Sequence, residues 1–137
     1  MTDPDFPIVI FHNPACGTSR NVVAMVRAAG YEPTIVDYLK TGWSHDRLTG
    51  LAARAGLGFK ALMREKGTPA ADLGLLANDA TDAQILEAML AHPILVNRPL
   101  VETPKGVKLC RPSEAVFDLL ERMPETFVKE DGEVVRF

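Results

Sequence analysis

The N-terminal part of the sequence switches its hydrophobic period twice, and this switch constrains the fold more than any other feature. Residues 8–11 form a short apolar run that follows Pro7, which is typical of a buried strand. From Cys16 the apolar residues follow a helical period that stops at Gly30, and residues 34–38 are β-rich again. Strand, helix and strand in about thirty residues are the size of a βαβ unit with parallel strands.

The segment at about 44–92 is predicted to be mainly helical. Ser44 is expected to cap the start of a helix that ends at Gly56, and Thr81 opens a capping box in front of a second apolar helix. No linker separates this segment from the rest of the chain. We therefore expect one domain, residues 1–137, with a helical insertion.

After Pro93 the pattern returns to that of strands. Apolar residues on either side of a turn at residues 103–106 predict a β-hairpin, and a last helix is expected between Pro112 and Pro124. The order is β-α-β, helical insert, β-β-α, which predicts an α/β, thioredoxin-like fold: a mixed sheet flanked by helices. Residues 125–137 show no clear pattern, and we expect no catalytic role there.

Composition and charge exclude several classes of protein. With 47% apolar and 24% charged residues, the chain is expected to pack a core rather than stay disordered. Fifteen basic and eighteen acidic residues give a net charge of -3, so no overall positive field attracts nucleic acid or anionic lipid. The start lacks a secretory signal and no apolar run is long enough to span a membrane. We expect a cytoplasmic protein with no nucleic-acid or membrane partner.

The two cysteines, Cys16 and Cys110, are too few for a disulfide scaffold, and no metal-ligand spacing accompanies them. Cys110, at the end of the hairpin, is expected to be a packed side chain. Cys16 instead stands at the start of a helix, where unpaired N–H groups lower a thiol pKa and bind an oxyanion.

The residues after Cys16 fit an anion site and exclude two related chemistries. Gly17 lets the backbone approach a ligand closely, and Thr18 and Ser19 offer hydroxyl donors. A cysteine phosphatase loop needs arginine six residues after the cysteine, but Val22 stands there. A dithiol site needs a second cysteine where Ser19 stands. A single-cysteine site remains, and its redox turnover would need an external thiol such as glutathione.

Three arginines from separate segments, Arg64, Arg98 and Arg111, are the candidate oxyanion ligands. Arg98 and Arg111 each precede a proline that fixes the local backbone, and a rigid guanidinium donates two hydrogen bonds to adjacent oxygens. Pro99 is expected to lie near the cysteine with a cis peptide bond after Arg98.

Three histidines complete the set of titratable candidates. His12, at the end of the first strand, either tunes the thiol electrostatically or satisfies a hydrogen bond at the strand end, and the sequence favours neither. His45 and His92 are expected to be structural or solvated.

Three longer segments carry a resemblance to a known family. Residues 12–20 (HNPACGTSR), 92–99 (HPILVNRP) and 109–114 (LCRPSE) together resemble the glutaredoxin- and glutathione-dependent arsenate reductases, the single-cysteine type of the ArsC family. The resemblance extends over roughly residues 8–122 and is weakest in the helical insert and the tail.

The resemblance implies a function and a role for each site residue. Cys16 would be the nucleophile, His12 the histidine beside it, and Arg64, Arg98 and Arg111 the arginines that bind the oxyanion. The substrate would be arsenate, which is reduced to arsenite through a thiol-arsenate intermediate. Glutathione would be the co-substrate and a glutaredoxin the protein partner, with no bound cofactor or metal. Glu65, next to Arg64, departs from the basic residue expected there.

Two other functions remain as alternatives. A glutathione-dependent thiol reductase of the same fold has no evident need for three arginines around its cysteine. A related family binds RNA polymerase without catalysis, and its members often carry a Cys-x-x-Cys switch, which Ser19 removes here.

Overall fold

The computed structural model describes residues 6–136, which divide into two compact units. The first unit comprises the residues up to Asp37 together with those from Arg98 onward, and the second comprises Tyr38–Asn97. The single domain expected from the sequence stays a prediction.

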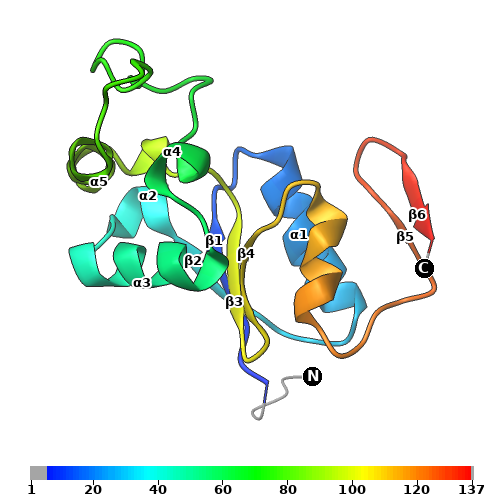
Figure 1. Cartoon of the computed structure of the whole chain (residues 1–137). Coiled ribbons are helices and arrows are strands. Elements are labelled where there is room, and N and C mark those ends of the chain that lie inside the picture. The colour runs from blue at the N-terminus through cyan, green and yellow to red at the C-terminus, as the bar shows by residue number, and fades with distance from the viewer. Residues whose placement is uncertain (1–5, 137) are drawn as a thin grey trace. The chain divides into compact units, whose positions relative to one another are not determined.

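A mixed four-stranded sheet forms the centre of the first unit (Figure 1). Strand β1 (Val9–His12) pairs in parallel with β2 (Thr34–Asp37) and antiparallel with β3 (Leu100–Thr103). Strand β3 continues as a hairpin into β4 (Gly106–Leu109), which gives the order β2-β1-β3-β4. The predicted βαβ unit and the predicted hairpin are both confirmed.

Helix α1 (Gly17–Ala28) connects the two parallel strands and ends as the sequence predicts. Gly30 has a φ of +96°, a left-handed conformation that a side chain would disfavour. The N–H groups of Gly30 and Tyr31 donate back to carbonyls of the last helical turn, which forms a Schellman cap. At the other end, Cys16 is the N-cap residue with an extended backbone.

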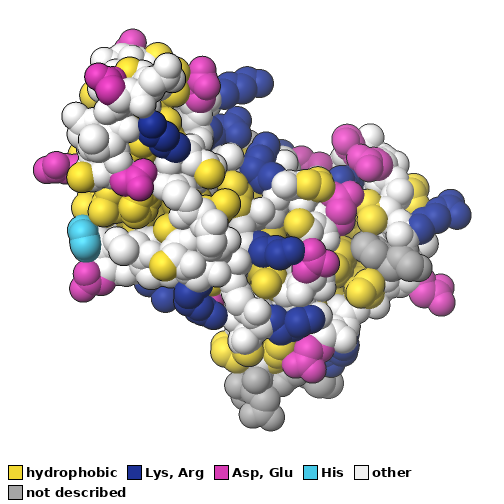
Figure 2. Space-filling model, viewed as in Figure 1, with side chains coloured by type: hydrophobic (Ala, Val, Ile, Leu, Met, Phe, Trp, Pro, Cys, Tyr) yellow, Lys and Arg dark blue, Asp and Glu magenta, His cyan; other side chains and the backbone are white. Residues whose placement is uncertain are grey.

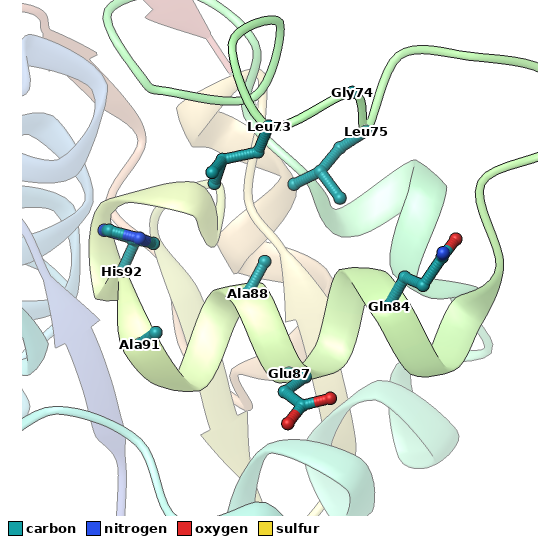
Figure 3. Close-up of a pocket in the computed structure, with 8 residues that line it drawn as sticks. All are labelled: Leu73, Gly74, Leu75, Gln84, Glu87, Ala88, Ala91 and His92. Carbon is teal, nitrogen blue, oxygen red and sulfur yellow. The ribbon is translucent and has the colours of Figure 1, made fainter.

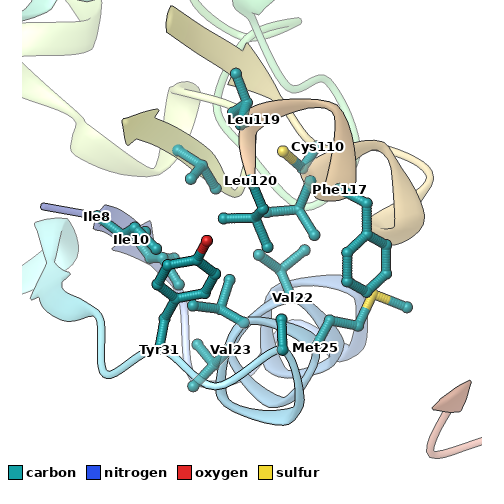
Figure 4. Close-up of a cluster of buried hydrophobic side chains, with 14 of the residues drawn as sticks. Ile8, Ile10, Val22, Val23, Met25, Tyr31, Cys110, Phe117, Leu119 and Leu120 are labelled. Atoms are coloured by element: carbon teal, nitrogen blue, oxygen red, sulfur yellow. The ribbon is translucent and has the colours of Figure 1, made fainter. Parts of the chain in front are cut away.

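Helix α1 and the 3-10 helix η2 (Ser113–Leu119) enclose the core of this unit against the sheet (Figure 4). The last helix is therefore shorter and tighter than the α-helix expected up to Pro124. Its buried residues are Ser113, Val116, Phe117 and Leu119.

A second, two-stranded sheet lies at the C-terminal end of the first unit. Strands β5 (Thr126–Val128) and β6 (Val134–Arg136) pair antiparallel as a hairpin. Phe127 and Val135 pack against the core, whereas Val128 and Val134 are exposed. The sequence pattern did not predict this hairpin.

The second unit is mainly helical, as expected for residues 44–92. The Ser44 hydroxyl accepts a hydrogen bond from the Arg47 N–H at 3.2 Å, and Thr81 and Gln84 form the predicted capping box. After Pro93 the chain forms a 3-10 turn before the strand starts at Leu100, so the strand-like region begins later than expected. The helices are α2 (Tyr38–Thr41), α3 (His45–Ala55), α4 (Phe59–Leu62), α5 (Asp82–Ala91) and η1 (Pro93–Leu95).

The surface carries charges of both signs. On the face shown in Figure 2, acidic and basic side chains are interspersed, in keeping with the small net charge. Among residues 6–136, none of the helices combines the length and the hydropathy needed to cross a bilayer.

Candidate active site

The loop between β1 and α1 holds Cys16 in a fixed position. Asn13, only 2% exposed, shapes this loop: its side-chain Oδ1 accepts from the Ala15 N–H at 2.9 Å and its carbonyl accepts from the Cys16 N–H at 3.0 Å. Pro14 restricts the backbone between them. Cys16 is 8% exposed, so its thiol is partly shielded from water at the start of the helix.

The Cys16 thiol has a pKa below its ordinary value of 9.0. Burial by itself raises this pKa, but hydrogen bonds from the backbone N–H of Ser19 and from the guanidinium groups of Arg98 and Arg111 outweigh it. The Nη1 atom of Arg111 lies 3.7 Å from the sulfur and also donates to the Arg98 carbonyl at 2.9 Å. These donors thus stabilise the thiolate, which is the nucleophilic form of cysteine.

The topology of the sheet explains why residues so far apart in sequence meet at Cys16. The end of β1 lies beside the start of β3, because Phe11 pairs with Leu100. The end of β4 lies at the same edge, because Leu109 also pairs with Leu100. Arg98 therefore lies just before β3 and Arg111 just after β4, both at this edge of the sheet.

Two cis peptide bonds lie at this edge, both after the arginines. The Arg98–Pro99 bond is cis, which confirms the expectation, and the Arg111–Pro112 bond is also cis, which was not expected. Pro99 is buried.

His12 and Ser19 form a hydrogen-bonded pair behind the thiol. The His12 Nδ1 atom lies 2.6 Å from the Ser19 Oγ, which also accepts from the Asn13 N–H at 3.1 Å. Burial lowers the pKa of His12, Asp37 partly offsets this and Arg20 lowers it further, so the ring is neutral at neutral pH. Ser19 thus uses its hydroxyl within the protein, and its backbone N–H reaches the sulfur.

The other predicted site residues lie in both units. Gly17 and Thr18 are half-buried in the first turn of α1. Arg64 belongs to the second unit, where its Nε donates to the Lys66 carbonyl at 3.1 Å and its Nη1 to the Asn97 Oδ1 at 3.5 Å. A role for Arg64 at the thiol stays a prediction.

Comparisons with known proteins identify the family. Its model, described as the ArsC family, matches residues 11–119. The chain belongs to the ArsC family. Arsenate reductase ArsI2 of Synechocystis is 57% identical over 129 residues, 93% of this chain and 92% of that protein. An arsenate reductase of Escherichia coli is 51% identical over 129 residues, with coverage of 93% and 92%.

Solved structures of relatives confirm the thioredoxin-like α/β fold. An arsenate reductase from Vibrio cholerae superposes with a TM-score of 0.79 at 34% identity, over 84% of this chain and 98% of that one. The chain therefore matches ArsC-family proteins in both sequence and fold.

The second cysteine of this ArsC-family chain lies in the core. Cys110 is 0% exposed, and burial raises its pKa to about 12 (Figure 4). The expectation that Cys110 is a packed side chain is confirmed. His45 and His92 are exposed, and His45 pairs with its neighbour Asp46 at 3.1 Å.

Arg20 and Glu130 were not among the site residues assigned from the sequence, although Arg20 belongs to the segment 12–20 that carries the family resemblance. Arg20, one helical turn after Cys16, donates to the Pro14 carbonyl at 2.8 Å and to the Glu130 carboxylate. Arg20 could have been suspected because it follows the cysteine by four residues on the same helix. No sequence signal links it to Glu130, which lies 110 residues away.

A cavity of about 350 Å³ lies elsewhere, within the second unit, between α5 and residues 73–75 (Figure 3). Its titratable side chains are Glu87 and His92, and it contains no nucleophile. Within residues 6–136, no three side chains of His, Cys, Asp or Glu gather closely enough to hold a metal ion. The expectation of a reaction without a metal stays a prediction.

Proposed function

We propose that this ArsC-family protein reduces arsenate to arsenite, with Cys16 as the nucleophile and with glutathione and a glutaredoxin as electron donors. The observation that carries the proposal is the Cys16 sulfur, which accepts hydrogen bonds from a helix-start N–H and from Arg98 and Arg111. The names of the 50–57% identical relatives support the same activity. We include the cytoplasm as the compartment, because the reaction consumes reduced thiols.

The first step is a substitution at arsenic. The Cys16 thiolate attacks arsenate, a sulfur–arsenic bond replaces one arsenic–oxygen bond, and the oxygen leaves as water. The guanidinium forks of Arg98 and Arg111 neutralise the remaining oxygens while the N–H groups of the first turn of α1 add further donors. We assign the third arginine, Arg64, to the same oxyanion.

The next steps transfer two electrons to arsenic. Glutathione replaces a second oxygen, which leaves as water, so that arsenic is bound to two sulfurs and is still five-valent. The glutaredoxin thiolate attacks the glutathione sulfur, the sulfur–arsenic bond breaks, and its electron pair stays on arsenic, which becomes three-valent. Water then displaces Cys16, and arsenite leaves. One mixed disulfide of glutaredoxin and glutathione forms for each arsenite, which balances the electrons.

An arsenite-release assay with glutathione and glutaredoxin tests the proposal. The wild type and Cys110→Ser are expected to make arsenite, and Cys16→Ser is expected to make none. Cys110→Ser is the matched control, because it makes the same sulfur-to-oxygen change at the cysteine in the core. A wild type that makes no arsenite would contradict the activity. A Cys16→Ser variant that keeps it would contradict the mechanism.

A further inference from the structure

The turn of the C-terminal hairpin contacts the first turns of α1, next to Cys16. The Glu130 carboxylate accepts two hydrogen bonds from Arg20, one from Nε at 3.1 Å and one from Nη2 at 2.7 Å. The Glu130 N–H donates to the Asn21 Oδ1 at 3.1 Å. The side chains of Arg20 and Glu130 are 45% and 46% exposed. A bidentate ion pair thus joins the tail to the catalytic helix.

Gly17 makes room for the Glu130 carboxylate. A Cβ atom at Gly17 would lie 3.1 Å from the Glu130 Oε1, which is closer than an ordinary contact. Gly17 directly follows Cys16, and the first turn of α1 contains no acidic residue of its own. The tail therefore supplies a negative charge beside the start of the helix, where an anionic ligand of Cys16 would also be attracted.

Arg20 is fixed by this contact and does not donate to the sulfur. Its third hydrogen bond goes from Nη1 to the Pro14 carbonyl at 2.8 Å, in the loop that carries Cys16. The hydrogen bonds to Glu130 raise the pKa of Arg20, and the charge of the Cys16 thiolate raises it too. Arg20 is thus close enough to act electrostatically on the thiolate, while its guanidinium is occupied by other partners.

We propose that Glu130 is a positioning residue: it holds the Arg20 guanidinium against the Pro14 carbonyl and compensates its charge. The oxyanion at Cys16 then meets Arg98 and Arg111, but not an uncompensated Arg20. This inference rests on the oxyanion site of the proposed function. A weaker positive field weakens the binding of any tetrahedral oxyanion of the same charge, arsenate and phosphate alike, so inorganic phosphate can serve as the probe.

The hairpin has other attachments, so a change at Glu130 leaves it in place. Phe127 and Val135 pack against the core. The Lys129 Nζ, 11% exposed, pairs with the Glu114 Oε1 at 3.0 Å. Glu130→Gln removes the charge with little change of shape, and Glu130→Asp keeps the charge.

Protection of Cys16 by inorganic phosphate against iodoacetamide, measured by peptide mass spectrometry, tests the proposal without arsenate turnover. In Glu130→Gln, the phosphate concentration that halves the alkylation rate is expected to fall roughly two- to fivefold, the size of an exposed ion pair. Glu130→Asp is expected to behave as the wild type. So is Glu133→Gln, which removes an equal charge from the same hairpin, where Glu133 lies 3.6 Å from the Lys129 Nζ.

The pH midpoint of Cys16 alkylation is a second readout that a merely structural role would not move. The charged groups that act on the thiol are Arg98 and Arg111 at the ends of β3 and β4, and Arg20 on α1. His12, at the end of β1, contacts the Ser19 hydroxyl instead. Glu130→Gln removes the compensation of Arg20 as well as a negative charge beside the helix start, so the midpoint is expected to move to lower pH. When Arg20→Gln is already present, the same Glu130→Gln change is expected to move the midpoint less.

Three outcomes would overturn the proposal. Equal shifts in Glu130→Gln and Glu133→Gln would mean that only net charge matters. An equal movement of the midpoint on adding Glu130→Gln to the wild type and to Arg20→Gln would mean that Arg20 is not the intermediary. A wild type that phosphate does not protect would remove the oxyanion site itself. If protection follows the expected pattern but no arsenite forms in the turnover assay, the proposed function fails and the role of Glu130 stands.

Discussion

The two cysteines of this chain have the same side chain and opposite chemistry. The Cys16 sulfur, at the start of α1, is surrounded by a backbone N–H and two guanidinium groups, and its pKa is lowered. The Cys110 sulfur lies among apolar side chains, and its pKa is raised to about 12. Both residues are buried, so burial alone does not decide the reactivity.

The difference shows what must accompany a buried thiol to make it a nucleophile. Removing a thiolate from water is unfavourable unless donors replace the lost water. At Cys16 the donors are supplied by α1 and by the two ends of the β3–β4 hairpin. At Cys110 the thiol donates to the Lys108 carbonyl, 3.8 Å from the sulfur, which favours the protonated thiol.

The largest expected effect comes from changing a guanidinium group beside Cys16. Arg98→Lys keeps the charge but loses the planar fork, and one such contact is worth about 1.5 to 3 kcal/mol, or about tenfold to a hundredfold in kcat/KM for arsenate. Arg27→Lys is the control, because Arg27 is exposed and, within residues 6–136, forms its ion pair with the exposed Glu32. Steady-state kinetics measure both. Full activity in Arg98→Lys would argue against bidentate binding.

The next effect concerns Cys110 and the pH dependence of the free energy of unfolding. Above pH 9 the unfolded thiol loses its proton, whereas the folded thiol, with a pKa of about 12, keeps it. The stability that Cys110 contributes is therefore present below pH 9 and is lost as the pH rises toward 12. From pH 8 to 10.5 we expect the wild type to lose about 2 kcal/mol more than Cys110→Ala in urea unfolding. Parallel losses in the two proteins would contradict the raised pKa.

The smallest effect concerns the pair behind the active thiol. Ser19→Ala removes the partner of His12 and leaves the buried Asn13 N–H without its acceptor. We expect a loss of about 1 to 2 kcal/mol in the free energy of unfolding, measured in urea at pH 7. Thr18→Ala, one position earlier and half-buried, is expected to stay within about 0.5 kcal/mol of the wild type. Equal stabilities of the two variants would contradict the role given to the Ser19 hydroxyl.

Much of the fold could be predicted because local chemistry determines it. The change of period around Cys16, the cap at Gly30 and the capping box at Thr81 each act within a few residues. Each of the three site residues also has a local signal, since Cys16 stands at the start of α1 and Arg98 and Arg111 flank the β3–β4 hairpin, but their meeting depends on how the strands pair.

What could not be predicted depends on contacts between distant segments. In each of the three-residue strands β5 and β6, the middle residue, Phe127 or Val135, is half-buried and its neighbours are exposed. One half-buried position in a strand is too short an alternation to predict that strand from the sequence. The pairing of Glu130 with Arg20 joins exposed side chains 110 residues apart, and charges of this kind are common on any surface. The apolar pattern of residues 113–119 predicts a helix, but it does not separate the 3-10 form of η2 from an α-helix.

Alkylation of the native wild type by iodoacetamide, followed at each cysteine by peptide mass spectrometry from pH 5 to 10, tests the contrast between the two thiols most directly. Cys16 is expected to react with a midpoint below pH 9, and Cys110 is expected to stay unmodified until the protein unfolds. A Cys16 midpoint at or above pH 9, or equal reaction of both thiols, would contradict the assignment of Cys16 as the activated nucleophile.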